Sequence, residues 1–122
     1  MKVVFIAGPF NGDRTDKARR KNVEIAQTYA NALARHGVGF YCPHIHAMQL
    51  MLSEGAPTDD GFFRELNKYY FEKVCSAVLA LPGWEESGGA RGEVEEARKR
   101  NWPVFESKAP DDLEDVIRWC QE

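Results

Sequence analysis

Four short apolar runs alternate along the chain with longer segments in which apolar residues recur every three or four positions. A uniformly apolar run of this length favours a strand that is buried on both faces, as in a parallel sheet. The spacing in the longer segments favours amphipathic helices. Strands are expected at 3–7, 38–41, 77–81 and 102–105, and helices from after Thr15 to His36 and at 62–74, 90–100 and 111–120, with weaker helical character at 44–53.

This alternation predicts one α/β domain that spans residues 1–122. We expect a doubly wound sheet of the Rossmann-like or flavodoxin-like kind, with four to five parallel strands and helices on both faces. Ligands of such sheets bind beyond the carboxyl ends of the strands, near the point where the strand order reverses. Three loops meet this condition, at 8–14, 42–46 and 82–89.

Composition narrows the choice of partners. The chain has 122 residues, 29% of them charged, and a formal net charge of −3. This balance provides no basic face for a nucleic-acid polymer or an anionic membrane. The apolar runs are far shorter than the ~20 residues of a membrane span. No targeting segment is expected, and three widely spaced cysteines without a C-x-x-C pair indicate reduced thiols, so we expect a cytoplasmic protein.

The loop after the first strand contains Gly8, Pro9 and Phe10, followed by Asn11 and Gly12. It lacks both the G-x-G-x-x-G pattern of dinucleotide-binding folds and the lysine of a Walker A loop. Its glycines would allow a ligand to approach the backbone closely, and Phe10 offers a face on which a planar base could stack. The alternative is an ordinary turn from strand to helix.

A second glycine-rich loop, which contains Ser87, Gly88 and Gly89, precedes the helix expected at 90–100. Amide N–H groups at a helix N-terminus, together with the helix dipole, favour a bound anion, and the Ser87 hydroxyl could add a hydrogen bond. A phosphate fits this arrangement. The alternative is that Ser87 only caps the helix and the glycines provide a flexible approach.

Glu93 differs from the other acidic residues of this helix in its helical phase. At ~100° per residue, it lies about 65° from the centre of the apolar stripe that runs from Ala90 to Ala97, whereas Glu95 and Glu96 lie some 130° away. Glu93 therefore borders the buried side, where the helix dipole is expected to favour its ionised, nucleophilic form. The alternative is that all three carboxylates only balance the dipole.

Cys42, His44 and His46 alternate along the chain, so an extended segment would turn all three to one side as metal ligands. Pro43 and the absence of a fourth ligand argue against zinc, and no metal is expected. A histidine in the wall of a pocket, or a loop histidine with no role, accounts for the pattern better.

In its two glycine-rich loops and in Glu93, the chain resembles the nucleoside 2-deoxyribosyltransferase superfamily, including its nucleoside 5′-monophosphate N-glycosidase branch. It is most similar to small bacterial and phage members, and the similarity covers nearly the whole chain. The most specific part is residues 81–90, LPGWEESGGA, followed by Glu93 and Ala97. The resemblance implies that Glu93 attacks the anomeric carbon of the sugar, and that a serine at position 87 accompanies recognition of a 5′-phosphate.

The chain departs from that superfamily at an aspartate that members usually carry on the helix before the third strand. The matching residue here is Lys68, or Asn67 with a shift of one. Asp59, Asp60, Glu65 and Glu72 lie nearby but out of register, and another common aspartate, at the start of the third strand, is Ser76. The group that assists departure of the base is therefore unassigned.

The expected function is an N-glycosidase that cleaves the base–sugar bond of a nucleoside or deoxynucleoside 5′-monophosphate, with Glu93 as the nucleophile of a retaining mechanism. No cofactor is required. The phosphate is expected to be held by Ser87, the amides of Gly88 and Gly89, and Arg91. The sugar and base are expected to contact Gly8, Pro9 and Phe10, with His44 as a further wall.

Two alternatives stay open. One is a nucleoside 2-deoxyribosyltransferase that acts on free nucleosides. The other is a non-catalytic nucleotide-binding sensor or accessory subunit, which the missing aspartate motivates. In each case the partner is a small nucleotide or nucleoside, and the resemblance implies a homodimer.

Overall fold

The computed structural model describes residues 1–56 and 61–122 of the chain. Within these ranges, four parallel strands form one sheet in the order β2-β1-β3-β4. Their bounds are β1 Val3–Ala7, β2 Gly39–Tyr41, β3 Ala77–Ala80 and β4 Val104–Glu106. The sequence-based expectation of a four- to five-stranded parallel sheet is confirmed.

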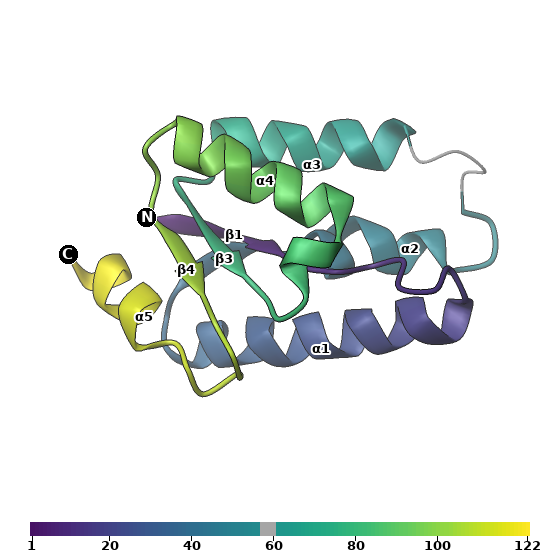
Figure 1. Cartoon of the computed structure of the whole chain (residues 1–122), viewed down its shortest axis with the longest axis horizontal. Helices are drawn as coiled ribbons and strands as arrows, with labels where there is room; N and C mark the ends of the chain where they lie inside the picture. The colour runs from purple at the N-terminus through teal and green to yellow at the C-terminus, as the bar shows by residue number, and fades with distance from the viewer. Residues whose placement is uncertain (57–60) are drawn as a thin grey trace.

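The helices cover both faces of this sheet, as expected for a doubly wound fold (Figure 1). On one face lie α1 (Asp16–Arg35) and α5 (Glu114–Gln121), and on the other lie α3 (Gly61–Lys73) and α4 (Gly88–Lys99). A π-helical turn, η1 (His44–Met48), continues into the short α2 (Gln49–Met51), and a 3₁₀ turn, η2 (Trp84–Glu86), precedes α4. No helix within the described ranges is long and apolar enough to cross a membrane.

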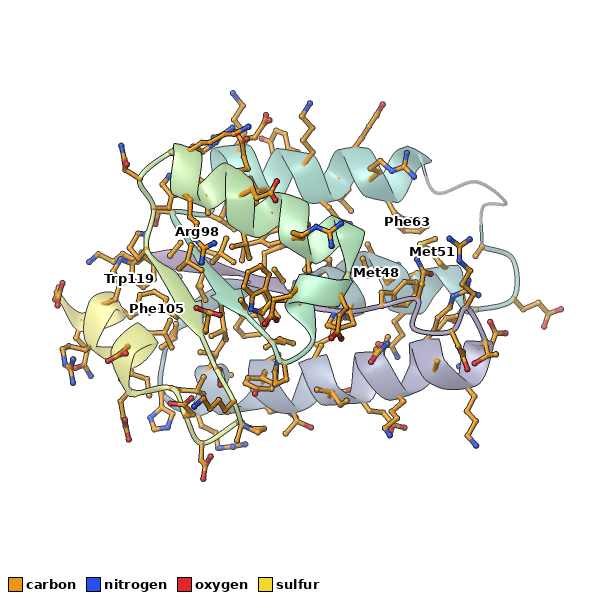
Figure 2. All side chains as sticks on the ribbon, in the orientation of Figure 1. Met48, Met51, Phe63, Arg98, Phe105 and Trp119 are labelled. Atoms are coloured by element: carbon orange, nitrogen blue, oxygen red, sulfur yellow. The ribbon has the colours of Figure 1, made fainter. Side chains whose placement is uncertain are left out.

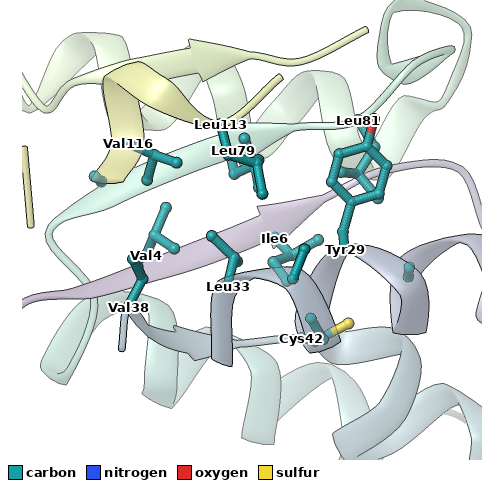
Figure 3. Packing of buried hydrophobic residues seen from close by; sticks show 14 residues of the cluster. Val4, Ile6, Tyr29, Leu33, Val38, Cys42, Leu79, Leu81, Leu113 and Val116 are labelled. Atoms are coloured by element: carbon teal, nitrogen blue, oxygen red, sulfur yellow. The ribbon is translucent and has the colours of Figure 1, made fainter. Parts of the chain in front are cut away.

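Alternation along the strands divides the core in two. In β1, Val4 and Ile6 pack on the α1 and α5 face, where they meet Leu33 and Leu79 (Figure 3), whereas Phe5 faces α3 and α4. Burying one such side chain fully contributes about 1.5–3 kcal/mol. The continuous apolar runs therefore reflect burial on both faces and hold the sheet as a rigid base for its loops.

Two element boundaries differ from the sequence-based expectation. The last strand begins at Val104 rather than at residue 102, because Trp102 donates its amide to the Ala97 carbonyl at 2.9 Å and closes the end of α4. Helix α4 begins at Gly88, two residues earlier than expected, because Ser87 acts as its N-cap. Gly88 and Gly89 are thus the first residues of the helix and not part of a loop before it.

The strand order places the switch point between β1 and β3. The chain leaves β1 through α1 to reach β2 on one side, and returns through α3 to reach β3 on the other. The loops that follow β1 and β3 therefore lie side by side at the carboxyl edge of the sheet and lead to helices on opposite faces, which is where such folds place their ligands.

Candidate functional site

A cavity of about 1170 Å³ lies at this switch point, between the loops after β1 and β3 and helices α3 and α4. It is slightly larger than typical small-molecule sites, which enclose roughly 300–1,000 Å³. The structure brings together eight of the nine residues singled out from the sequence in its lining: Gly8, Pro9, Phe10, His44, Ser87, Gly88, Gly89 and Glu93.

The loops after β1 and β3 pack closely against each other. A Cβ on Gly8 would lie 3.0 Å from side-chain atoms of Leu81, and one on Gly83, whose φ is 85°, would lie 3.1 Å from Cγ of Pro9. Both glycines therefore serve this close approach, in addition to any contact with a ligand. The result is a compact floor for the cavity.

His44 holds the β1 loop in place. Its side chain is buried, and its Nε2 donates to the Pro9 carbonyl at 2.8 Å. Burial lowers the pKa of His44, which keeps the imidazole neutral. His44 lines the cavity, but its hydrogen bond assigns it to positioning Pro9.

The alternation of Cys42, His44 and His46 does not produce a metal site. The segment folds into the helical turn η1 and is not extended, so the three side chains do not share one side. The His44 Nδ1 lies 4.0 Å from the Cys42 sulfur, whereas the His46 Nδ1 lies 2.9 Å from the Cys42 carbonyl oxygen. Among the described residues, no group of three His, Cys, Asp or Glu side chains is arranged to hold a metal ion.

Phe10 offers less stacking surface than the sequence suggested. Its ring meets His44 edge to face at 6.3 Å between centroids, and the residue is 9% exposed. The partly exposed apolar side chains at this end of the cavity are Met48 and Met51, which lie near the buried Phe63 of α3 (Figure 2). The two methionines therefore offer more accessible apolar surface to this part of the cavity than Phe10 does.

Helix α4 presents one wall of the cavity, the α4 wall, formed by Ser87, Gly88, Gly89, Gly92 and Glu93. The Ser87 hydroxyl accepts from the Ala90 amide at 3.4 Å, so it caps the helix. The amides of Gly88 and Gly89 have no hydrogen-bond partner among the described residues. A Cβ on either residue, or on Gly92, would meet nothing within 4 Å. The first turn of α4 therefore offers bare backbone donors to the cavity.

Arg91 does not belong to this wall, which corrects its assignment to the phosphate site. The side chain is exposed and is not part of the cavity lining. Its Nη1 instead donates to the Glu85 carbonyl at 2.9 Å, which ties η2 to α4. Arg14 is a cation that does line the cavity, and its φ of 69° is unusual for a residue other than glycine.

Glu93 reaches the cavity from the second turn of α4, as its helical phase predicted. Its carboxyl has no hydrogen bond or ion pair among the described residues, and burial raises its pKa to about 8. The expectation that the helix dipole keeps Glu93 ionised is therefore wrong. Since α4 begins at Gly88, Glu93 lies beyond the first turn, where the dipole acts most strongly.

Helix α3 presents the opposite wall, the α3 wall, formed by Arg64, Asn67, Lys68, Phe71 and Glu72. Their spacing is that of one helix face, a signal that the sequence already contained. The Tyr41 hydroxyl donates to the Asn67 Oδ1 at 2.8 Å. Burial raises the pKa of Tyr41 to about 12, so the hydroxyl keeps the proton of this bond.

The carboxylates nearest to Lys68 along the chain do not replace the missing aspartate. Glu65 is exposed and lies outside the cavity lining. Glu72 pairs with Arg100 at 3.8 Å, and Arg100 also pairs with Glu96 at 3.0 Å. Ser76 lies outside the cavity lining, where its amide donates to the Val3 carbonyl at the opposite edge of the sheet. Asp59 and Asp60 lie outside the described residues.

Comparison with curated proteins gives no match to the chain. The sequence model of one protein family, described as a domain of unknown function (DUF7768), matches residues 2–107. That range includes all four strands and both walls of the cavity. The chain belongs to this family.

Proposed function

We propose that the protein is an N-glycosidase that hydrolyses the base–sugar bond of a nucleoside or deoxynucleoside 5′-monophosphate. The observation that carries the proposal is that one helix face presents to one cavity a carboxyl, Glu93, and two backbone donors, at Gly88 and Gly89, none of which has a partner among the described residues. A nucleophile and an anion site one turn apart suit a sugar whose anomeric carbon and 5′-phosphate must be held together.

The chemistry follows that of a retaining glycosidase. The ionised Glu93 attacks C1′, the C1′–N bond breaks, and its electron pair leaves with the base. Water then attacks C1′ of the glycosyl ester, which releases the sugar phosphate and restores the carboxylate. The proton lost by the water balances the one that the departing base takes up.

The two ends of the cavity suit the two ends of such a substrate. The phosphate would accept hydrogen bonds from the amides of Gly88 and Gly89, with the cation of Arg14 in the same lining. The base would lie toward Met48 and Met51, where polarizable apolar side chains suit a planar ring. Glu93, in the second turn of α4, would face the sugar.

Release of free base from a panel of nucleoside 5′-monophosphates, with ribose and with 2′-deoxyribose, tests the proposal. The wild type is expected to release base, and Glu93→Gln to lower the rate by at least ~10³-fold, because it removes the nucleophile. Glu95→Gln is the matched control, since Glu95 is exposed on the same helix and lies outside the cavity lining. Equal rates for the two variants would contradict the role of Glu93.

A non-catalytic nucleotide-binding module is the second candidate, because no unpaired carboxyl faces the cavity from the described part of α3. Calorimetric binding of a monophosphate without release of base on prolonged incubation would favour it over the enzyme. Adding a second free base separates hydrolysis from transfer, since only a transferase would form the exchanged nucleotide.

A further inference from the structure

The α3 wall offers hydrogen-bond donors to the cavity. The Tyr41 hydroxyl holds the Asn67 Oδ1, and Tyr41 is not part of the cavity lining, so this bond turns the acceptor end of the amide toward the protein. The donor end, Nδ2, is left for the cavity. One residue further on, the ammonium of Lys68 has no hydrogen bond or ion pair among the described residues and can only donate.

Lys68 and Glu93 lie at the same height on the two walls. Helices α3 and α4 both connect parallel strands and therefore run in the same direction. Arg100 pairs with Glu72 on α3 and with Glu96 on α4, which fixes the two helices relative to each other. Lys68 precedes Glu72 by about 6 Å of helix, and Glu93 precedes Glu96 by about 4.5 Å.

Both side chains line the cavity, yet no ion pair joins them in the described structure. Space therefore remains between the nucleophile and the ammonium. A sugar held against Glu93 would place the polar edge of its base, the leaving group, toward Lys68 and Asn67, while the ring face lies toward Met48 and Met51.

The remaining carboxylates do not supply an acid at this position. Glu72 and Glu96 are paired with Arg100, and Glu86 belongs to η2, immediately before the helix cap Ser87, and not to α3. Adenine, guanine and cytosine depart readily when an acid protonates a ring nitrogen. A wall of donors whose one carboxyl group, Glu72, is paired with Arg100 instead suits a base that departs as an anion.

We infer that, if the proposed glycosidase activity is correct, its substrates are nucleotides of oxo-pyrimidines such as uracil and thymine, and that Lys68, assisted by Asn67, stabilises the base as it departs. When the C1′–N1 bond breaks, its electron pair enters the ring and the charge spreads to the carbonyl oxygens. The carbonyl next to N1 accepts hydrogen bonds from Lys68 and the Asn67 Nδ2. The base takes its proton from water after release.

The test compares two leaving groups in two lysine variants. Uracil release from dUMP and 5-fluorouracil release from 5-fluoro-dUMP are measured for the wild type, Lys68→Met and Lys68→Arg. Fluorine makes the departing anion more stable, so it needs less help from the protein. Lys68→Met is expected to slow uracil release by about 100-fold and 5-fluorouracil release by about 10-fold, as for loss of a group that stabilises developing charge.

Lys68→Arg keeps the charge and is expected to recover most of the rate for both substrates. Lys73→Met is the matched control, because Lys73 is exposed at the end of the same helix and outside the cavity lining, and both rates should stay within about twofold of wild type. Equal slowing of both substrates by Lys68→Met would show that Lys68 has only a structural role. No slowing would show that Lys68 has no role in the reaction. Either result overturns the inference.

The wild type is also expected to prefer dUMP and dTMP over dCMP, dAMP and dGMP, and faster release of a purine or of cytosine would overturn the substrate class. Two failures are distinguishable. If no monophosphate yields free base, the proposed activity is wrong and this inference falls with it. If Glu93→Gln abolishes release while Lys68→Met leaves it intact, the activity stands and only the role of Lys68 is wrong.

Discussion

The two walls of the cavity present different kinds of chemical group. The α4 wall offers mainly backbone groups: its first turn has two glycines, whose amides have no partner among the described residues, and it is capped by Ser87. Glu93, in the second turn, is the side chain that we propose acts on the sugar. The α3 wall works through side chains, with Asn67 and Lys68 as donors. In the proposed substrates, the helix N-terminus would suit the phosphate, which is common to all of them, and the side chains would suit the base, which differs between them.

The sharpest way to examine the α4 wall is the pH dependence of base release. Burial raises the pKa of Glu93 to about 8, so the nucleophile is mostly protonated and inactive at neutral pH. We expect kcat/KM to rise with pH and to reach its plateau above pH 8. The value at pH 6.5 should be about 30-fold below the plateau.

Initial rates at low substrate concentration, measured from pH 6.5 to 9.5, provide this profile. The range starts above the second pKa of a phosphate monoester, which is about 6, so ionisation of the substrate contributes little to the curve. A rate that falls through pH 8 would instead make Glu93 a general acid and would contradict its assignment as nucleophile.

A substitution of Gly88 tests the contribution of the backbone donors of the α4 wall to binding without changing the functional side chains. Gly88 is the first residue of the helix, and Ser87 before it has an extended conformation with φ −105° and ψ 117°, so proline is compatible with this position. Gly88→Pro removes one amide N–H and leaves the helix intact. We expect KM for a nucleoside 5′-monophosphate to rise by about tenfold, from the loss of one hydrogen bond to a charged group.

Gly88→Ala is the matched control for this variant, because it keeps the amide and its Cβ would meet nothing within 4 Å. Its KM should stay close to that of the wild type. If alanine raises KM as much as proline does, the effect is steric and the amide does not bind the phosphate.

The two walls also differ in how far the sequence predicted them. Local patterns identified the α4 wall, since Ser87 with two glycines marks a helix start and the phase of Glu93 follows from helical geometry alone. The α3 wall was recognised only as the lack of an expected aspartate. The role of Asn67 depends on its contact with Tyr41, which lies 26 residues away, and no local pattern encodes such a contact.

The same distinction explains the errors at single residues. Arg91 was assigned from its proximity to the glycines, but the carbonyl of Glu85 holds its side chain outside the cavity. The charge state of Glu93 was predicted from the helix dipole, whereas burial between two helices, a tertiary effect, dominates its pKa. The parallel sheet was predicted correctly because burial on both faces leaves a continuous apolar run in each strand.

The smallest expected effect concerns thermal stability, which should depend on the ionisable residue of the α4 wall and not on that of the α3 wall. The pKa of Glu93 is raised from 4.5 to about 8 in the folded protein, so the folded state is favoured by protonated Glu93 at low pH, and this contribution is lost as pH rises through 8. Glu93→Gln cannot ionise and should therefore raise Tm by on the order of 5 °C at pH 9 and by little at pH 4.5.

Thermal unfolding at the two pH values, with Glu95→Gln and Lys68→Met alongside, measures this difference. The latter two variants change exposed side chains, so their Tm should follow that of the wild type at both pH values. A gain confined to Glu93→Gln at high pH would show that the α4 wall keeps its carboxyl at a cost to folding, as expected of a residue retained for chemistry. An equal Tm for Glu93→Gln and wild type at pH 9 would mean that water reaches the carboxyl freely, and the shifted pH profile of base release should then disappear as well.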